Sequence, residues 1–455
     1  MLNSFYFYGQ VITMGYLRAA TPSRLINSAF RRTTRSPLLS QPGATANYFA
    51  KQRNLSTVHD GILSPRSAFI PANEAYRPLS LDLPSQPDTK WPSIWLRDNC
   101  QCRACIHPST RQRAINTFSI PADIKPKNIQ HKENSIEIEW DNDGHKSVYT
   151  YEWLKNHTFG SSNLYPSPNI RNSDLASRGL AFASDPSAYP TVDYEKVMSS
   201  DEGVAEWTAK IYKYGFCFVK GCPVTPEATE KLIERIAFIR HTHYGGFWDF
   251  TADLKKKDTA YTTEELGAHT DNTYFTEPAG LQMLHLLSHT DGEGGASLLV
   301  DAFEAARILY EEDIEAYKLL TLPVLTSHAS GNEDVCIQPS VPFPVLYHHP
   351  VTGDLLQVRW NNDDRAAKMY TTPEATDLWY RAARKWNEIL RRKSMEQWFQ
   401  LEPGTPMIFD NWRMLHGRSS FVGKRRMCGA YLNRDDFISR YRLLNHGRQK
   451  VLAEI

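Results

Sequence analysis

Short apolar segments recur from about residue 191 onward, and they limit the folds open to this chain. Segments with strand character are 215–219, 280–287, 296–300, 406–409 and 427–432. Amphipathic spacing predicts helices over 202–212, 226–241, 301–322 and 373–392. Many short strands with a few flanking helices are typical of a β-sandwich or barrel decorated by helices. We therefore predict a mainly β domain over residues 191–455.

The N-terminal 59 residues differ sharply in composition from the rest. They contain no Asp or Glu and are rich in Arg, Ser, Thr and Ala. Such a segment is typical of a mitochondrial transit peptide, and Arg53 precedes Ser56 as in a matrix-protease cleavage site. We predict a transit peptide over 1–59 and a mitochondrial matrix location. A disordered basic tail is the alternative.

Charge and hydropathy exclude several classes of partner. The formal net charge is +1, which gives no reason to expect nucleic acid as a partner. No apolar run approaches the roughly 20 residues needed to span a bilayer, so no membrane association is expected. The apolar positions of 373–392 could form the interface of a homodimer, which we predict, although core packing would produce the same pattern.

Residues 60–165 are expected to form a small β-rich domain, followed by a Ser-, Pro- and Asn-rich linker over 166–190. Residues 135–140 alternate apolar and polar side chains, as a half-buried strand does. Cys100, Cys102 and Cys105 place three thiols within six residues. Thiolates favour Zn²⁺, and a closed structural zinc site needs a fourth ligand. Three free thiols are the alternative.

A candidate iron site begins at His269 and Asp271, which are one residue apart. On an extended strand their side chains point to the same face. A second His brought in by the fold would complete the two-His, one-carboxylate set of non-haem Fe(II) oxygenases. The same pattern recurs at 131–133 and 289–291. The latter leads into Gly-Glu-Gly-Gly and is better interpreted as a turn, whereas the former lies in the small domain.

The candidate for the third ligand is His416, which follows the apolar strand 406–409. Arg425 comes nine residues later. A buried guanidinium can bind a carboxylate through two hydrogen bonds. An iron oxygenase needs such a cation for the distal carboxylate of 2-oxoglutarate.

With these motifs the chain, from about residue 90 to 445, resembles the γ-butyrobetaine / trimethyllysine dioxygenase family of 2-oxoglutarate-dependent oxygenases. The resemblance rests on Asp258-Thr-Ala-Tyr-Thr, His269-Thr-Asp-Asn-Thr-Tyr-Phe, Leu299-Val-Asp, Asp410-Asn-Trp-Arg-Met-Leu-His-Gly-Arg and Gly429-Ala-Tyr-Leu-Asn-Arg-Asp-Asp. It implies a double-stranded β-helix (jelly-roll) core with flanking helices and a small N-terminal zinc domain. It also implies Fe(II), 2-oxoglutarate, ascorbate and zinc as cofactors.

The resemblance assigns individual residues as well. It implies iron ligation by His269, Asp271 and His416, and 2-oxoglutarate binding by Arg425, with Arg426 as the near alternative. The fourth zinc ligand would be His145, with His107 as the alternative.

The substrate implied by the resemblance is a small molecule with a trimethylammonium group, which aromatic faces hold best. The implied cage is Tyr244, Trp248, Tyr261 and Tyr431. Asp258 stands where γ-butyrobetaine enzymes have Asn, and would attract the α-ammonium of Nε-trimethyllysine. Asn361 and Asn362 are the implied partners of its carboxylate.

The implied activity is hydroxylation of Nε-trimethyllysine at C3, the first step of carnitine biosynthesis. Alternatives are a γ-butyrobetaine dioxygenase with the same chemistry, a non-catalytic zinc-dependent interaction protein, and a broader amino-acid or sulfonate oxygenase.

Overall fold

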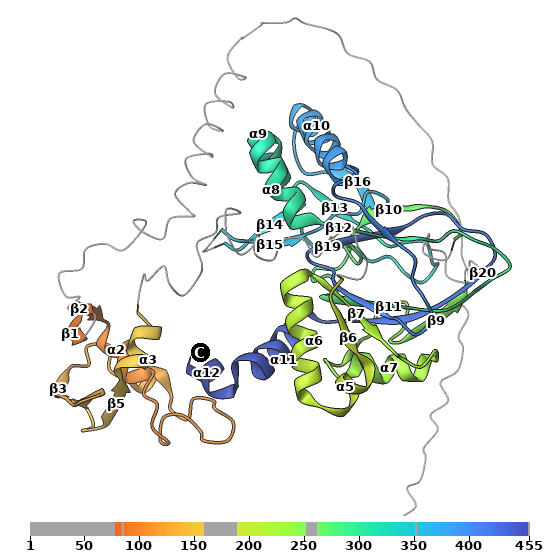
Figure 1. The fold of residues 1–455 in the computed structure, drawn as a ribbon. Coiled ribbons are helices and arrows are strands. Elements are labelled where there is room, and N and C mark those ends of the chain that lie inside the picture. The colour runs from red at the N-terminus through yellow and green to blue at the C-terminus, as the bar shows by residue number, and fades with distance from the viewer. Residues whose placement is uncertain (1–77, 84–85, 159–188, 252–261, 351–352, 454–455) are drawn as a thin grey trace, which may run out of the picture. The chain divides into compact units, whose positions relative to one another are not determined.

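The structure, a computed structural model, describes residues 78–83, 86–158, 189–251, 262–350 and 353–453 (Figure 1). The predicted transit peptide, most of the predicted linker, and the positions of Asp258 and Tyr261 lie outside the described residues. Among the described helices, none is long and apolar enough to cross a lipid bilayer.

The N-terminal region, residues 78–158, contains a hairpin, a three-stranded antiparallel sheet and short helices. The hairpin pairs β1 (Leu79–Leu83) with β2 (Gln86–Trp91), and the sheet has the order β3 (Pro126–His131), β4 (Ser135–Trp140), β5 (Lys146–Thr150). The helices are α2 (Ser93–Asp98), the 3₁₀ turn Thr117–Ser119 and α3 (Tyr151–Asn156). The alternation predicted for β4 is present, because Ile136, Ile138 and Trp140 are buried in the core of this region.

Residues 189–453 form two principal sheets. The seven-stranded sheet has the order β6 (Thr191–Asp193), β7 (Phe216–Lys220), β18 (Met407–Asp410), β11 (Leu281–Thr290), β20 (Lys424–Leu432), β8 (Ile239–Arg240), and β9 (Trp248–Thr251) also pairs with β20. The four-stranded sheet has the order β10 (Leu266–His269), β19 (Met414–Arg418), β12 (Ser297–Asp301), β17 (Gln397–Phe399). Neighbouring strands in these sheets are antiparallel except β6 and β7.

An apolar core joins the inner faces of the two sheets. Phe216 and Phe218 of β7 and Phe409 of β18 meet Leu299 of β12 and Met414 of β19 there. Side chains from the other face of β7 pack against helices instead, so this strand is apolar on both faces. The predicted mainly β fold with flanking helices, of the double-stranded β-helix type, is thereby confirmed.

Helices cover the outer faces of both sheets (Figure 1). On the seven-stranded sheet lie α5 (Tyr194–Ser199), α6 (Asp201–Tyr214), α7 (Pro226–Glu234) and α11 (Arg434–His446), which α12 (Arg448–Ala453) follows. On the other side are α8 (Ala302–Glu312), α9 (Ile314–Leu320), α10 (Pro373–Leu390) and two small antiparallel sheets, which pair β13 (Leu325–Ser327) with β16 (Arg365–Met369) and β14 (Leu346–His348) with β15 (Leu355–Val358).

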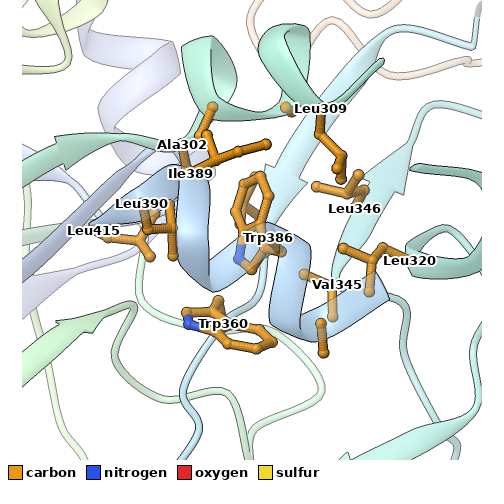
Figure 2. Close-up of a cluster of buried hydrophobic side chains, with 14 of the residues drawn as sticks. Ala302, Leu309, Leu320, Val345, Leu346, Trp360, Trp386, Ile389, Leu390 and Leu415 are labelled. Atoms are coloured by element: carbon orange, nitrogen blue, oxygen red, sulfur yellow. The ribbon is translucent and has the colours of Figure 1, made fainter. Parts of the chain in front are cut away.

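Figure 2 shows how α10 uses its apolar face. Trp386 projects from α10 into a buried cluster that includes Leu309, Leu346 and Trp360. The ring centroids of Trp360 and Trp386 are 6.5 Å apart. The apolar stripe of residues 373–392 is therefore used in the core, and the homodimer remains a prediction.

Two helix predictions need correction. The predicted helix 226–241 ends at Glu234, and Ile239 and Arg240 instead pair with β20. The predicted helix 301–322 is divided into α8 and α9 at Asp313. The Asp313 carboxylate accepts a hydrogen bond from the backbone N–H of Ala316, 2.9 Å away, and so starts a new helix.

Buried His285 on β11 makes stability depend on pH. The Gly404 backbone N–H donates to its Nε2 at 3.0 Å, so Nδ1 carries the proton and donates to Thr229 Oγ1 at 2.6 Å. Burial lowers the pKa of His285 to about 4, below the roughly 6.5 of an unfolded chain.

Between these two pKa values the unfolded state binds the additional proton. The free energy of unfolding should therefore fall as the pH drops below about 6.5, by about 2 kcal/mol at pH 5. Chemical denaturation at pH 7.5 and pH 5 measures the difference. His285→Gln should reduce this dependence, whereas His289→Gln, near the partly exposed end of the same strand, should retain it. Equal slopes in the two variants would contradict the assignment.

Candidate active site

The pairing of β10 with β19 brings the two predicted histidines together. His269, the last residue of β10, is the direct cross-strand partner of His416 on β19. The Nε2 atoms of His269 and His416 lie 3.2 and 3.7 Å from the same oxygen, Oδ1 of Asp271. One ligand atom from each of the three residues falls within 4.8 Å of the others. The structure therefore assembles the predicted two-His, one-carboxylate set.

A local turn aims the Asp271 carboxylate at the histidines. The next residue, Asn272, has a φ of 62°, a left-handed conformation that Asn tolerates better than most residues. Asn411 fixes the turn from the other strand: its Oδ1 accepts from the Asp271 N–H at 2.8 Å, and its Nδ2 donates to the Asp271 carbonyl at 3.0 Å. Asn411, which holds the Asp271 backbone, was not singled out from the sequence, although it lies in the 410–418 motif.

Hydrogen bonding and charge prepare the three side chains to receive a cation. Nδ1 of His269 donates to the Gly267 carbonyl at 2.8 Å, which leaves Nε2 toward Asp271. Burial would lower the pKa of His269, but the hydrogen bond and charge of Asp271 outweigh it and raise this pKa to about 9. Burial and the charge of His269 lower the pKa of His416 to about 3. The Asp271 carboxylate is therefore held in its charged form, and a divalent cation bound by these three residues would displace the His269 proton.

One cavity contains these three residues together with most of the other predicted site residues. Its wall includes Arg425, Tyr244, Trp248, Tyr431 and Asn361. Asn362 does not line it; this side chain is exposed and accepts a hydrogen bond from Arg365.

Successive side chains of β20 point to opposite faces of the sheet, so the two candidate arginines point in opposite directions. Arg425 is buried and lines the cavity, whereas Arg426 is exposed and pairs with Asp249, Nε to Oδ1 at 2.8 Å. Arg425 is therefore better placed than Arg426 to bind 2-oxoglutarate in this cavity, because the Arg426 side chain points to the opposite face of the strand.

The guanidinium of Arg425 is suited to a carboxylate ligand. The residue is 7% exposed, and within the described part of the chain its Nε has no hydrogen-bond partner. A Cβ at position 295 would lie 3.3 Å from the Arg425 side chain, so Gly295 leaves room for that side chain. Burial and the charge of Arg418 lower the pKa of Arg425 to about 10. Arg425 therefore remains cationic at neutral pH.

Aromatic side chains line the cavity beside the Asp271 carboxylate. The rings of Trp248 and Tyr431 meet edge-on, with centroids 5.9 Å apart, and the Tyr431 hydroxyl donates to Oδ2 of Asp271 at 2.7 Å. A Cβ on Gly429 would lie 2.5 Å from the Trp248 ring, so only glycine permits this ring position over β20.

Further cavity residues were missed at the sequence level. Three polar examples are Tyr274, Arg418 and Asp364. Tyr274 donates to the Tyr244 hydroxyl at 3.2 Å. Tyr274 and Arg418 lie in motifs that carried the family resemblance, so the signal was present. Asp364, whose Oδ2 accepts from Asn361 at 2.8 Å, has no such signal.

The N-terminal region contains a second convergent cluster. Nε2 of His145 lies 3.3, 3.7 and 3.5 Å from the sulfurs of Cys100, Cys102 and Cys105, respectively. Typical Zn–S and Zn–N bonds arranged as a tetrahedron place S and N about 3.5 Å apart. His145, rather than His107, completes the set that could hold a metal ion.

The two-sheet core, the two-His, one-carboxylate centre and the buried arginine define a non-haem iron dioxygenase of the 2-oxoglutarate-dependent class. The family model "Taurine catabolism dioxygenase TauD, TfdA family" matches residues 176–431. A second, "Gamma-butyrobetaine hydroxylase-like, N-terminal", matches residues 70–155.

Curated relatives place the chain within this class. The trimethyllysine dioxygenase of Neurospora crassa is 48% identical over 81% of this chain and 83% of its own length. The mitochondrial trimethyllysine dioxygenase of Homo sapiens is 38% identical over 77% and 82%. The gamma-butyrobetaine dioxygenase of Homo sapiens is 28% identical over 80% and 93%. The chain therefore belongs to the trimethyllysine dioxygenases, within the TauD, TfdA family.

Proposed function

We propose that this chain hydroxylates Nε-trimethyllysine at C3, using Fe(II), 2-oxoglutarate and O₂, as the first step of carnitine biosynthesis. The observation that carries the proposal is a single cavity that contains the His269–Asp271–His416 centre, a buried arginine and aromatic side chains. Greater identity to trimethyllysine dioxygenases than to the gamma-butyrobetaine dioxygenase favours trimethyllysine over γ-butyrobetaine as the substrate.

His269, Asp271 and His416 would hold the iron. When bound, it supplies oxidative decarboxylation of 2-oxoglutarate to succinate and CO₂, with transfer of one oxygen atom to the substrate C–H bond. Arg425 binds the distal carboxylate of 2-oxoglutarate. Tyr244, Trp248 and Tyr431 hold the trimethylammonium group through their aromatic faces, because this group has no hydrogen-bond donor. The position of the bound chain then decides which carbon reacts.

The amino-acid end of the substrate has its own proposed contacts. Asp258 would attract the α-ammonium, and Asn361 is better placed than Asn362 to meet the carboxylate, because only Asn361 lines the cavity. Tyr261 completes the proposed cage.

Several further features belong to the same proposal. Zinc would occupy the Cys100–Cys102–Cys105–His145 cluster, and ascorbate would keep the iron reduced. Domains over 60–165 and 191–455, a matrix location and a homodimer remain predictions. Several relatives, including the one from Mus musculus, are named as mitochondrial enzymes, which supports the proposed matrix location.

A substrate comparison tests the activity. Purified protein is supplied with Fe(II), 2-oxoglutarate and either trimethyllysine or γ-butyrobetaine, and succinate and hydroxylated product are measured. We expect kcat/KM to favour trimethyllysine by at least about tenfold, because a site built for an ammonium discriminates against its absence. A preference for γ-butyrobetaine, or no turnover of either compound, would overturn the proposed substrate.

The neighbouring arginines provide a matched test of co-substrate binding. Arg425→Gln should raise the KM for 2-oxoglutarate at least about 30-fold, since losing one partner of a buried charge pair costs about 2–5 kcal/mol. Arg426→Gln removes the same charge from the exposed face and should leave this KM nearly unchanged. The reverse ranking, measured by succinate formation against 2-oxoglutarate concentration, would refute the assignment.

A further inference from the structure

The hydroxyl of Tyr431 contacts the metal-binding carboxylate directly. It donates to Oδ2 of Asp271 at 2.7 Å, whereas the histidines face the other oxygen, Oδ1. Oδ1 of Asp271 thus faces the two histidines, whereas Oδ2 accepts the hydrogen bond from Tyr431.

We propose that Tyr431 is a positioning residue for the iron centre, in addition to the place that its ring takes in the proposed cage. Its hydroxyl holds Oδ2 away from the ion, so that Asp271 binds through Oδ1 alone. The ring's part in substrate binding rests on the proposed function, whereas the hydroxyl's part depends only on the metal centre.

The surroundings of Tyr431 fix the hydroxyl in this position. Tyr431 lies in β20, paired with Gln282 of β11 on one side and Arg240 of β8 on the other. It is 6% exposed, and its ring packs edge-on against Trp248. A hydrogen bond to a charged acceptor is shorter and stronger than a neutral one. A donor held in this way restrains the carboxylate, which would otherwise rotate about its terminal bond.

The restraint matters because a two-His, one-carboxylate centre works by leaving coordination positions open. A carboxylate that bound through both oxygens would occupy a position that 2-oxoglutarate or O₂ requires. Tyr431 also connects the ligand to the aromatic wall, so displacement of its ring by a substrate would be transmitted to Asp271.

Tyr244 provides a matched control in the same wall. Its hydroxyl accepts a hydrogen bond from Tyr274 at 3.2 Å, and Asn272 donates to Tyr274 at 3.3 Å. Phenylalanine at position 244 or 431 therefore removes one hydroxyl and keeps the ring. Only the change at 431 removes a hydrogen bond to a proposed metal ligand.

The test compares the wild-type protein with Tyr431→Phe and Tyr244→Phe. Fe(II) affinity is titrated without substrate and without O₂, and the charge-transfer absorption of the Fe(II)–2-oxoglutarate complex is recorded. Without the hydroxyl the Asp271 carboxylate is free to rotate out of its binding orientation, so we expect Tyr431→Phe to weaken Fe(II) binding about 10- to 100-fold, the usual effect of removing a partner that orients a metal ligand, and to shift the absorption band. Tyr244→Phe should do neither. The KM of Tyr431→Phe for trimethyllysine should stay within about twofold, since the ring remains.

Unchanged Fe(II) affinity and absorption in Tyr431→Phe would overturn the inference, as would equal effects in the two variants. Circular dichroism and the midpoint of thermal unfolding establish that each variant is folded before titration. Failure of the wild-type protein to turn over trimethyllysine would count against the proposed function alone, because the Fe(II) titration uses no substrate.

Discussion

Asp271→Asn is expected to reduce trimethyllysine-dependent succinate formation at least about 100-fold. Loss of an outer partner of a metal ligand costs about 10- to 100-fold, so loss of the ligand's own charge should cost at least the upper value. The amide is neutral, so it can no longer balance the charge of a divalent cation. Fe(II) titration and succinate assays on the same preparation measure binding and turnover together.

The chain contains its own control for this substitution. Asp291 ends a second His-Thr-Asp triplet, lies in a turn with a φ of 60°, and pairs with Lys424 at 3.4 Å. Asparagine also tolerates this conformation, so Asp291→Asn makes the same chemical change without backbone strain. It should keep near-wild-type turnover. Comparable losses in the two variants would mean that residues 269–271 are not the iron site.

Cys105→Ser should release the zinc proposed for the N-terminal region and unfold that region. Structural zinc contributes about 10–16 kcal/mol of apparent binding free energy in small domains, which exceeds the stability of most of them. Cys105 is buried, and the Nη1 of Arg97 donates to its sulfur at 3.4 Å. Metal analysis of the full-length protein should give about one zinc per chain for wild type and almost none for the variant.

Cys336→Ser is the matched control, because this thiol is exposed and lies outside the cluster. It should retain zinc and wild-type resistance of residues 78–158 to proteolysis. Wild-type protein without zinc, with the clustered thiols freely alkylated, would remove the proposal.

Strands whose apolar side chains are consecutive in the sequence could be predicted, including β18 with four residues. β7 and β18 carry core residues on both faces, so their sequences are continuous apolar runs. Strands β8, β9 and β10 lack such an apolar run and could not be found in this way. Each has two to four residues, and pairing with β20 or β19 rather than local propensity makes them strands.

The site residues likewise fall into two groups: those that a local sequence motif reveals and those whose contacts depend on distant parts of the chain. His269 and Asp271 are recognisable because both residue types lie in one short motif, and His416 follows from its order relative to Arg425. The choice between Arg425 and Arg426 needed the strand's orientation. The hydrogen bonds of Asn411 and Tyr431 to Asp271 join residues 140 and 160 positions apart. Such contacts depend on register, which no single segment reveals.

The direct pairing of His269 with His416 has a consequence for assembly of the molecule. Among the described residues, β10 is the edge strand of its sheet, and two registered residue pairs, with an irregularity between them, join it to β19. A slip of one residue would turn one imidazole to the opposite face. An ion that binds only the aligned ladder stabilises that alignment against fraying. An ion bound by His269, Asp271 and His416 would therefore favour the aligned pairing of β10 with β19 over a slipped one.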